Sequence, residues 1–382
     1  MEPMNKQLIA RRIKEERDRC NLKQIQVAEH MGWDSSGHAI VTQVESGERD
    51  LKAWELYKLA RLFHIEVEDF FKPASSSEPL VLWRNKPAQE LVSLKERQFL
   101  QRCEDYKFLE NLLEEKLPVK RPLPKCELNI ATVDEDWANE IADTVREQLN
   151  LGEFPAATLP KILEENYGIR FLSLPLDEGA AACSVYSFGP AILVNENEPW
   201  RQSFRIAHEL FHIITWDEEL MRKIASDPEM DRKNENLAEA FAAGLLIPET
   251  SLRQQMRHLV VDGMLKLSAI TALASEYRVS ANALLYRLKY LGFIPKELFD
   301  VILNDERFQA LDKQPSLKTC GNVIKIGDRF IKLACLAYQQ FNKISRSRLA
   351  KLLNVSLASL GTVLTSHGLM ETDNEEIRIS NS

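Results

Sequence analysis

Apolar residues in the first part of the chain recur at helical intervals. Leu8, Ile9 and Ile13 form one such set, and two further sets follow within the same segment. The alternation of apolar and polar residues that is typical of strands is absent from this part of the sequence. We therefore predict a compact all-α bundle of short helices over residues 1–73.

A run of serine and proline at residues 73–79 interrupts this pattern, because these residues favour extended, solvated backbone. A charged helical pattern returns over residues 93–117 and carries one apolar stripe. The stripe consists of Phe99, Leu100, Cys103, Tyr106, Leu109 and Leu112. We interpret residues 74–125 as a linker and connecting helix, which could also contact a second copy of the chain.

Residues 126–299 mix strand-like and helical patterns. Strands are predicted at residues 169–174, 181–188 and 191–195, and helices at residues 200–215, 234–246 and 268–291. Pro248 ends the second of these helices, because proline lacks the backbone donor that a helix needs. The chain is thus predicted to be multidomain, with an α+β domain that holds a small sheet and a mainly helical C-terminal domain over residues 300–382.

Composition narrows the class of protein. The chain has 382 residues, 45% of them hydrophobic and 28% charged, which is typical of two or three globular domains. A net charge of -8 argues against nonspecific coating of nucleic acid, although one small DNA-reading module remains compatible with it. We find no apolar run long enough to cross a membrane, and we expect no N-terminal signal peptide. The six cysteines are scattered without a C-x-x-C pair, so we predict a cytoplasmic protein with free thiols and no membrane partner.

Two of the seven histidines bracket a glutamate in the run His208-Glu209-Leu210-Phe211-His212. On a helix, positions four apart lie on one face, so both imidazoles can reach one zinc ion. Glu209 then lies beside the metal, where it can take a proton from a water molecule. Coincidence is the alternative, since composition alone yields this pattern in about one chain in a hundred.

A catalytic zinc ion usually has three protein ligands and one open position, so a third ligand is expected from a nearby helix. Glu235 is the best candidate, in a segment whose small residues Ala238 and Ala242 allow two helices to approach closely. Glu239, one turn later, is the rival ligand or an outer partner of a ligand. A solvated helix face is the ordinary alternative for either glutamate.

At this point the sequence resembles the ImmA/IrrE-type zinc metallopeptidases. Their pattern joins a His-Glu-x-x-His helix to a later Glu-x-x-Ala-x-x-Phe-Ala-x-x-Leu-Leu-x-Pro helix, which residues 235–248 match throughout. The resemblance extends over about residues 130–290 and implies a zincin-like fold, with Glu235 as a zinc ligand. Phe211 stands where the family often has glycine, and Glu239 where Asn or Asp is common; neither change removes a ligand.

The mechanism that these residues imply is hydrolysis by a zinc-activated water, with Glu209 as general base and then as proton donor to the leaving amine. The strand at residues 191–195 could hold the substrate as an added β-strand. Arg201, Arg205 and Tyr186 are candidates for stabilising the oxyanion, although ordinary surface or core roles are favoured for all three.

The first segment also resembles an XRE/Cro-type helix-turn-helix domain, over residues 22–32 and 40–49. Its recognition helix is expected to enter the major groove of double-stranded DNA. The candidate contacts with an operator are Gln24, Thr42, Gln43 and Arg49. The turn between the helices is about three residues longer than usual, and residues 1–72 hold 12 Lys and Arg against 13 Asp and Glu. A bundle that binds protein is therefore the alternative. A second, weaker helix-turn-helix pattern lies at residues 344–356, and a regulatory or partner-binding domain over residues 300–382 is an equal alternative.

Together these features predict a DNA-associated zinc metalloendopeptidase that cleaves a repressor or another regulatory protein. The alternative is a non-cleaving transcriptional regulator or antitoxin whose zinc domain senses a ligand or partner. A purely structural zinc site is a third possibility, although such sites normally have four Cys or His ligands. Cys183 could also reach the zinc ion and block it as a latency switch, although free cysteines are usually small buried hydrophobic residues. A homodimer is suggested by the two-fold symmetry of most operators.

Overall fold

The structure is a computed structural model of the chain. It describes residues 6–20, 22–33, 37–63, 65, 67–71, 79–85, 89–114, 117–118, 120–177, 179–197, 201–260, 265–312, 328–340 and 342–366. These residues are mostly helical and include one mixed sheet of four strands. Both findings agree with the predicted fold class for the middle of the chain.

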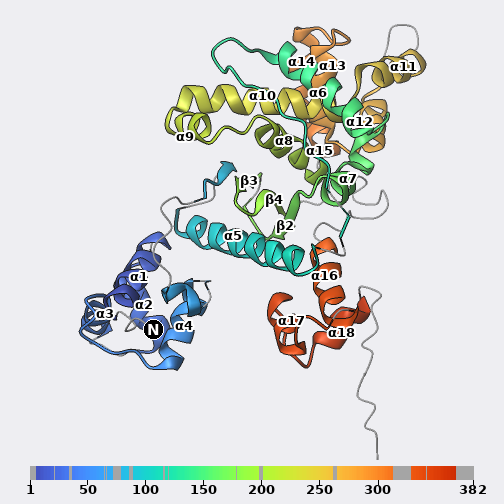
Figure 1. Ribbon diagram of the computed structural model, residues 1–382. Coiled ribbons are helices and arrows are strands. Elements are labelled where there is room, and N and C mark those ends of the chain that lie inside the picture. The colour runs from blue at the N-terminus through green and yellow to red at the C-terminus, as the bar shows by residue number, and fades with distance from the viewer. Residues whose placement is uncertain are drawn as a thin grey trace, which may run out of the picture.

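The first segment folds as a helical bundle, as its apolar spacing predicts (Figure 1). It comprises α1 (Lys6–Arg19), α2 (Gln24–Met31), α3 (Gly37–Glu45), α4 (Ala53–Phe63) and the 3-10 turn η1 (Val67–Phe71). Its core includes Ile13, Val27 and Phe63, whereas Ile25 is exposed although it fits the helical spacing. Gly32 ends α2 with a φ of 73°, a left-handed conformation that glycine adopts without steric cost.

The sheet has the strand order β1-β3-β4-β2. Its strands are β1 (Leu82–Arg84), β2 (Arg170–Leu174), β3 (Ala181–Tyr186) and β4 (Gly189–Asn195). β2 runs parallel to β4, whereas β3 is antiparallel to both β4 and β1. The last three strands match the predicted runs closely. β1 comes from the segment that the sequence indicates to be a linker, so this segment also completes the sheet.

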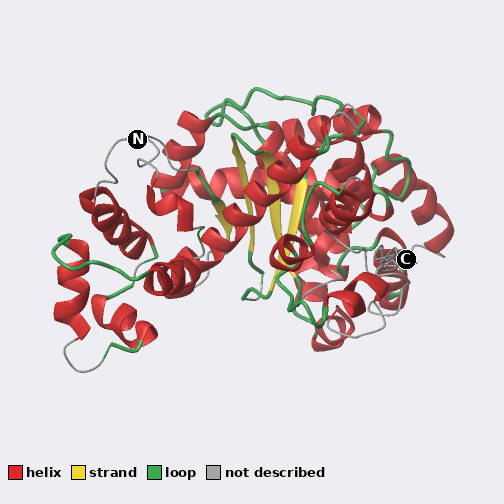
Figure 2. Cartoon of the chain, turned by 60° about the horizontal axis from the view of Figure 1, so that its bottom comes forward, coloured by secondary structure: helices red, strands yellow, loops and turns green. Residues whose placement is uncertain are grey.

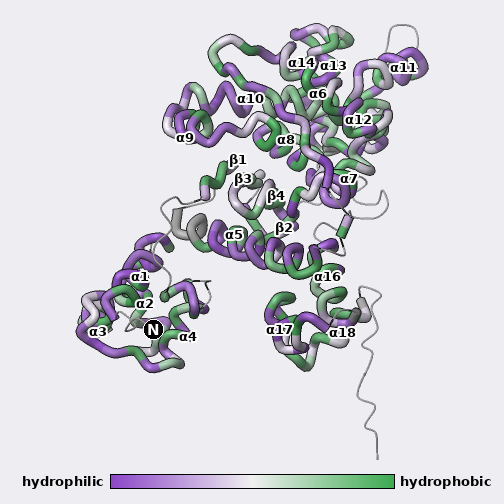
Figure 3. The backbone as a smooth tube through the Cα atoms, in the orientation of Figure 1, coloured by the Kyte–Doolittle hydropathy of each residue, from purple (hydrophilic) through white to green (hydrophobic). Residues whose placement is uncertain are grey.

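Helices cover both faces of the sheet (Figures 1 and 2). On one face, α5 (Gln89–Leu112) buries Phe99 and Cys103 against strand residues such as Ala182 and Leu193. Hydrophobic and hydrophilic positions alternate along this helix, as Figure 3 shows. The apolar stripe predicted for the connecting helix is therefore covered within one chain, which leaves it unavailable for contact with a second copy.

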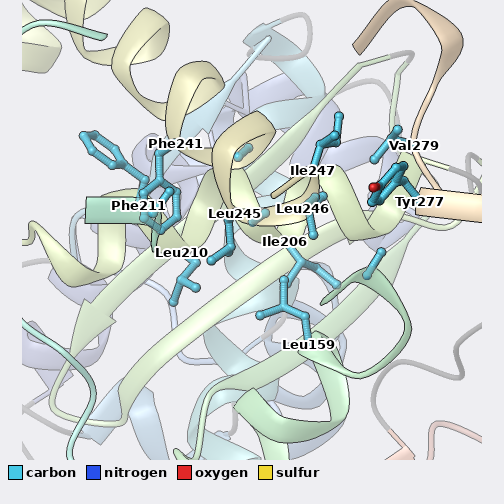
Figure 4. Packing of buried hydrophobic residues seen from close by; sticks show 14 of the residues in the cluster. Leu159, Ile206, Leu210, Phe211, Phe241, Leu245, Leu246, Ile247, Tyr277 and Val279 are labelled. Carbon is cyan, nitrogen blue, oxygen red and sulfur yellow. The ribbon is translucent and has the colours of Figure 1, made fainter. Parts of the chain in front are cut away.

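The other face carries α8 (Gln202–Ile214), which packs on β3 and β4, and α10 (Pro228–Leu246) packs on α8 and on α6 (Glu135–Leu149). Phe211 and Phe241 pack with their ring centroids 5.6 Å apart, and Leu210 and Leu245 extend this contact (Figure 4). Gly244 lets α10 approach α6, because a Cβ atom there would lie 2.6 Å from the Asn139 side-chain oxygen.

Two helices differ in length from the sequence prediction. α10 begins at Pro228 rather than at residue 234, because Asp227 caps it by accepting from the backbone of Glu229 and Met230. The single helix predicted over residues 268–291 is two helices, α12 (Leu267–Tyr277) and α13 (Ala281–Tyr290). Arg278 takes a left-handed conformation between them, and the Ser280 hydroxyl caps the second.

The remaining elements surround this core. They are η3 (Pro155–Ala157), α7 (Leu159–Asn166), α9 (Glu218–Ser226), α11 (Glu249–Leu259), α14 (Lys296–Leu303), α15 (Glu306–Asp312), α16 (Asp328–Cys335), η6 (Leu336–Gln340), α17 (Arg346–Leu352) and α18 (Leu360–Ser366). Phe299 and Phe308 belong to the main core, so α14 and α15 pack with the α+β unit although the predicted boundary falls at residue 300. The helices from α16 onwards form a separate cluster with Tyr106 and Leu109 of α5.

Five of the six cysteines are free thiols, and Cys320 falls outside the described residues. Among the helices that the structure describes, none combines the length and apolar character that spanning a bilayer requires.

Candidate metal centre

The two histidines of the His-Glu-x-x-His run lie on one face of α8. This helix has no interior proline or glycine, and almost every residue of it is buried. The Nε2 atoms of His208 and His212 are 3.3 Å apart, so one helical turn brings both imidazoles to one point.

Glu235 of α10 meets both imidazoles. Its two carboxylate oxygens lie 3.2 Å from His208 Nε2 and 3.3 Å from His212 Nε2. One ligand atom from each of the three side chains lies within 4.8 Å of the others, which makes this a group that could hold a metal ion. The structure thus brings together the three residues that the sequence indicates as metal ligands.

Both histidines have polar neighbours at their second ring nitrogen. Nδ1 of His212 lies 3.2 Å from the side-chain amide of the buried Asn234. Turning this amide over would offer its oxygen, which has no hydrogen-bond partner among the described residues, to an Nδ1–H. His208 Nδ1 lies 4.0 Å from the carboxylate of Glu239, which is beyond hydrogen-bond distance. A partner such as Asn234 fixes a histidine so that its Nε2 faces the metal.

Glu239, the rival ligand, is not part of the three-residue group. Its side chain is 43% exposed, compared with 29% for Glu235, and it forms an ion pair with Arg84 of β1. The structure therefore places Glu239 beside a ligand, in the position of an outer partner. Arg84 lies in the predicted linker, and neither its spacing nor its neighbours in the sequence indicate a role here.

Glu209 is buried, and burial raises the pKa of its carboxyl group to about 7. Cys183 of β3 donates a hydrogen bond to Glu209 from its thiol. Burial and the negative charge of Glu209 raise the pKa of this thiol well above its usual range, so Cys183 stays protonated. Cys183 thus contacts the predicted base and is absent from the three-residue ligand group.

The charges in this group favour a cation. Burial alone would raise the pKa of Glu235, but hydrogen bonds and charge from the two histidines hold it well below its usual range. Burial lowers the pKa of His208, so this imidazole is neutral near pH 7. An ionised carboxylate and two imidazole nitrogens that converge on one point are the donor set that zinc prefers. The residues present therefore fit a zinc ion.

The other predicted site residues are placed as follows. β4 is paired on both sides, with β3 and with β2, so the expectation that residues 191–195 hold a substrate strand is wrong. Arg205 is buried and donates to the Ala180 carbonyl at 2.7 Å, which is a structural role. Tyr186 packs in the apolar cluster between α5 and the sheet, on the face of the sheet that lies away from α8.

A cavity of about 610 Å³ lies on the side of Glu239 that faces away from the three metal ligands. Its lining includes Arg84 and Glu239, together with Arg201 of the turn before α8 and the aromatic rings of Tyr286 and Tyr290 from α13. The lining includes Glu239, the neighbour of His208, but none of the three residues of the metal group. Its charged and aromatic side chains are suited to binding a peptide side chain.

The predicted DNA contacts differ in their exposure and in their partners. Thr42 and Gln43 are exposed on α3, the predicted recognition helix. Gln24 instead donates to Glu45 at 2.9 Å, and Arg49 pairs with the buried Glu55 at 2.8 Å and lies over the Trp33 ring. The helix starts at Gly37, which shortens the long turn seen in the sequence.

Residues 164–289 match the family described as the IrrE N-terminal-like domain, Peptidase_M78. The matched stretch contains β2, β3, β4 and the helices that carry the metal group, and it supports a metallopeptidase-type function that acts on a protein substrate. The N-terminal bundle and β1 lie outside the match. A comparison with curated proteins finds no match to the chain.

We predict that Glu235→Gln and Glu239→Gln, the same change one turn apart on α10, affect zinc differently. Loss of an outer partner costs about 10–100-fold in metal affinity, and Glu239→Gln should stay within that range. Glu235→Gln should lose more, because a ligand is removed. Competition with a chromophoric zinc chelator measures both. The reverse order of losses would identify Glu239 as the ligand.

Proposed function

We propose that this chain is a zinc-dependent metalloendopeptidase with Glu209 as its general base. The observation that carries the proposal is a buried carboxylate next to a three-residue metal group, with a pKa raised by burial to about 7. A structural zinc site has no use for such a group, and it normally has four Cys or His ligands. The family match of residues 164–289 supports the same class of reaction.

His208, His212 and Glu235 would hold the zinc ion. When bound, zinc acts as a Lewis acid that polarises the scissile carbonyl and lowers the pKa of water towards about 7. Glu209 accepts the proton of the attacking water near neutral pH and passes it to the leaving amine. The Cys183 thiol holds one side of the Glu209 carboxylate by its hydrogen bond, so that the other oxygen can face the substrate.

The substrate that we propose is a repressor or another regulatory protein, and the N-terminal bundle would bring the peptidase to it on a double-stranded DNA operator. Exposed Thr42 and Gln43 on α3 support DNA reading, because glutamine can pair with adenine in the major groove. Two-fold operators favour a homodimer. The compartment that we propose for the protein is the cytoplasm, where free thiols such as Cys183 stay reduced.

The second candidate is a regulator or antitoxin that senses a ligand without cleaving. Its support is the burial of the site, since His208, Glu209 and His212 are each at most 2% exposed. A sensor would have no need of Glu209 as a base, so replacing this residue separates the two functions.

We predict that Glu209→Gln keeps zinc and abolishes cleavage in cells. General-base catalysis contributes about 10²–10⁴-fold to such a reaction, so new protein N-termini should appear only with the unchanged chain. Mass spectrometry of N-termini from cells that make either form provides the comparison, with and without DNA damage. Equal sets of N-termini under every condition, with zinc retained in both forms, would favour the sensor.

We also predict that Gln43→Ala weakens and relaxes DNA recognition. A bidentate side-chain contact with a base is worth about 1–3 kcal/mol of discrimination. Selection from random DNA duplexes with the full chain should enrich an inverted repeat. The Gln43→Ala chain should lose its base preference at one position in each half-site. Gln309→Ala, the same change at an exposed residue of α15, is the control. A chain that enriches no sequence would instead point to a protein-binding bundle.

A further inference from the structure

Without β1, the edge of the sheet on the side of the metal group would be β3. Cys183 of this strand contacts Glu209, and α8 lies against β3 and β4. A peptidase holds an extended substrate most simply as a strand added to such an edge, since the backbone hydrogen bonds are then independent of side chains. In this chain the β3 edge is already paired, because β1 lies along it in antiparallel register.

β1 belongs to a segment, residues 79–85, that we call the strap. Leu82 of the strap lies opposite Cys183, and Arg84 lies opposite Ala181. The Ser184 hydroxyl donates to the Leu80 carbonyl at 2.7 Å, which extends the contact beyond the paired residues. The strap therefore covers the stretch of β3 that faces the predicted base.

The side chains of the strap alternate between the two faces of the sheet, as in any strand. Val81 and Trp83 point towards α5 and pack in the apolar cluster between α5 and the sheet. Leu82 packs on the opposite face, and Arg84 reaches Glu239, the neighbour of His208. An apolar residue and a cation, two positions apart, are thus the groups that the strap presents to the metal side.

This placement leaves little access to the metal group. The side chains of His208, Glu209 and His212 are almost completely buried, although a peptidase must bring the scissile bond of its substrate to them. The strap lies along the edge that an extended substrate would need. It also originates outside the stretch that matches the peptidase family.

We propose that the strap occupies the substrate's place on β3, and that the peptidase is blocked by its own chain until the strap leaves. The inference rests on the proposed peptidase function. It also names a substrate class: an extended segment that carries an apolar residue and, two positions later, an arginine or lysine for Glu239. Such a segment forms the same backbone pairs as the strap and competes with it.

The test uses three full-length, zinc-loaded chains in the Glu209→Gln background, so that no peptide is cut. The first is otherwise unchanged. The second, Leu82→Ala/Arg84→Ala, lacks both metal-side contacts of the strap. The third, Trp83→Cys/Ala182→Cys, ties the strap to β3 by a disulfide on the α5 face, away from the metal group. Residues 83 and 182 are register partners, and paired residues in antiparallel strands lie within the Cα distance that a disulfide spans.

The probe is a fluorescent peptide with the sequence of residues 79–85, and its control has glutamate in place of the arginine. Because the apparent affinity scales with the fraction of open sites, the released chain should bind the probe at least about tenfold more tightly than the unchanged strap. The oxidised, tied chain should not bind, and reduction should restore binding. The control peptide should bind none of the chains.

Equal binding by all three chains, or binding to the oxidised form, would overturn the proposal, because the site would then be open with the strap in place. Failure of the released chain to bind would do the same and would make β1 a permanent strand. With Glu209 restored, the released chain should cleave its substrate faster than the natural chain. A different result would separate the two proposals. If peptide binding depends on the strap as predicted but no chain cleaves any protein, the proposed peptidase function is wrong and the proposed role of the strap is retained.

Discussion

The contact of the Glu235 carboxylate with two imidazoles is the interaction on which the rest of this structure depends. α8 alone can place His208, Glu209 and His212 on one turn, but it leaves buried polar groups that cost free energy unless they find partners. Glu235 provides one partner from a second helix, and a metal ion would neutralise the charge that remains. The close packing of α8, α10 and α6, with alanine and glycine at their contacts, places this carboxylate beside the two imidazoles.

The part of the site that depends on local spacing could be predicted from the sequence. Two histidines four residues apart lie on one face of any helix, so their convergence is predictable from spacing alone. The helix that carries Glu235 is predictable from its pattern of small and apolar residues. The choice between Glu235 and Glu239 depends on how α10 is turned towards α8, which a single sequence does not specify. Arg84 could not be found in advance, because only the pairing of β1 with β3 brings it near His208.

The fold was predictable to a similar extent. Periodicity indicated the N-terminal bundle and three of the four strands, because each of them buries a regular apolar face. β1 is only three residues long and half-buried, so it leaves no such pattern. The domain boundaries predicted near residues 125 and 300 lie at changes in composition, whereas α5 and α14 pack across them.

α5 connects the parts of the molecule physically. It packs on the sheet through Phe99, joins the C-terminal helices through Tyr106, and pairs through Arg97 with the buried Glu16 of α1. Since the strap lies just before α5 in the chain, a change in the N-terminal bundle has a short route to the β3 edge. A DNA-binding unit and a blocked peptidase on one chain would be coupled in this way.

The measurement that tests the central claim most directly is X-ray absorption spectroscopy of the full chain loaded with less than one equivalent of zinc. If His208, His212 and Glu235 hold the metal with one position open, the nearest shell contains only nitrogen and oxygen, at about 2.0–2.2 Å, with the multiple-scattering pattern of imidazole. A sulfur atom at about 2.3 Å would contradict this, because it would place Cys183 on the metal and close the position that catalysis needs.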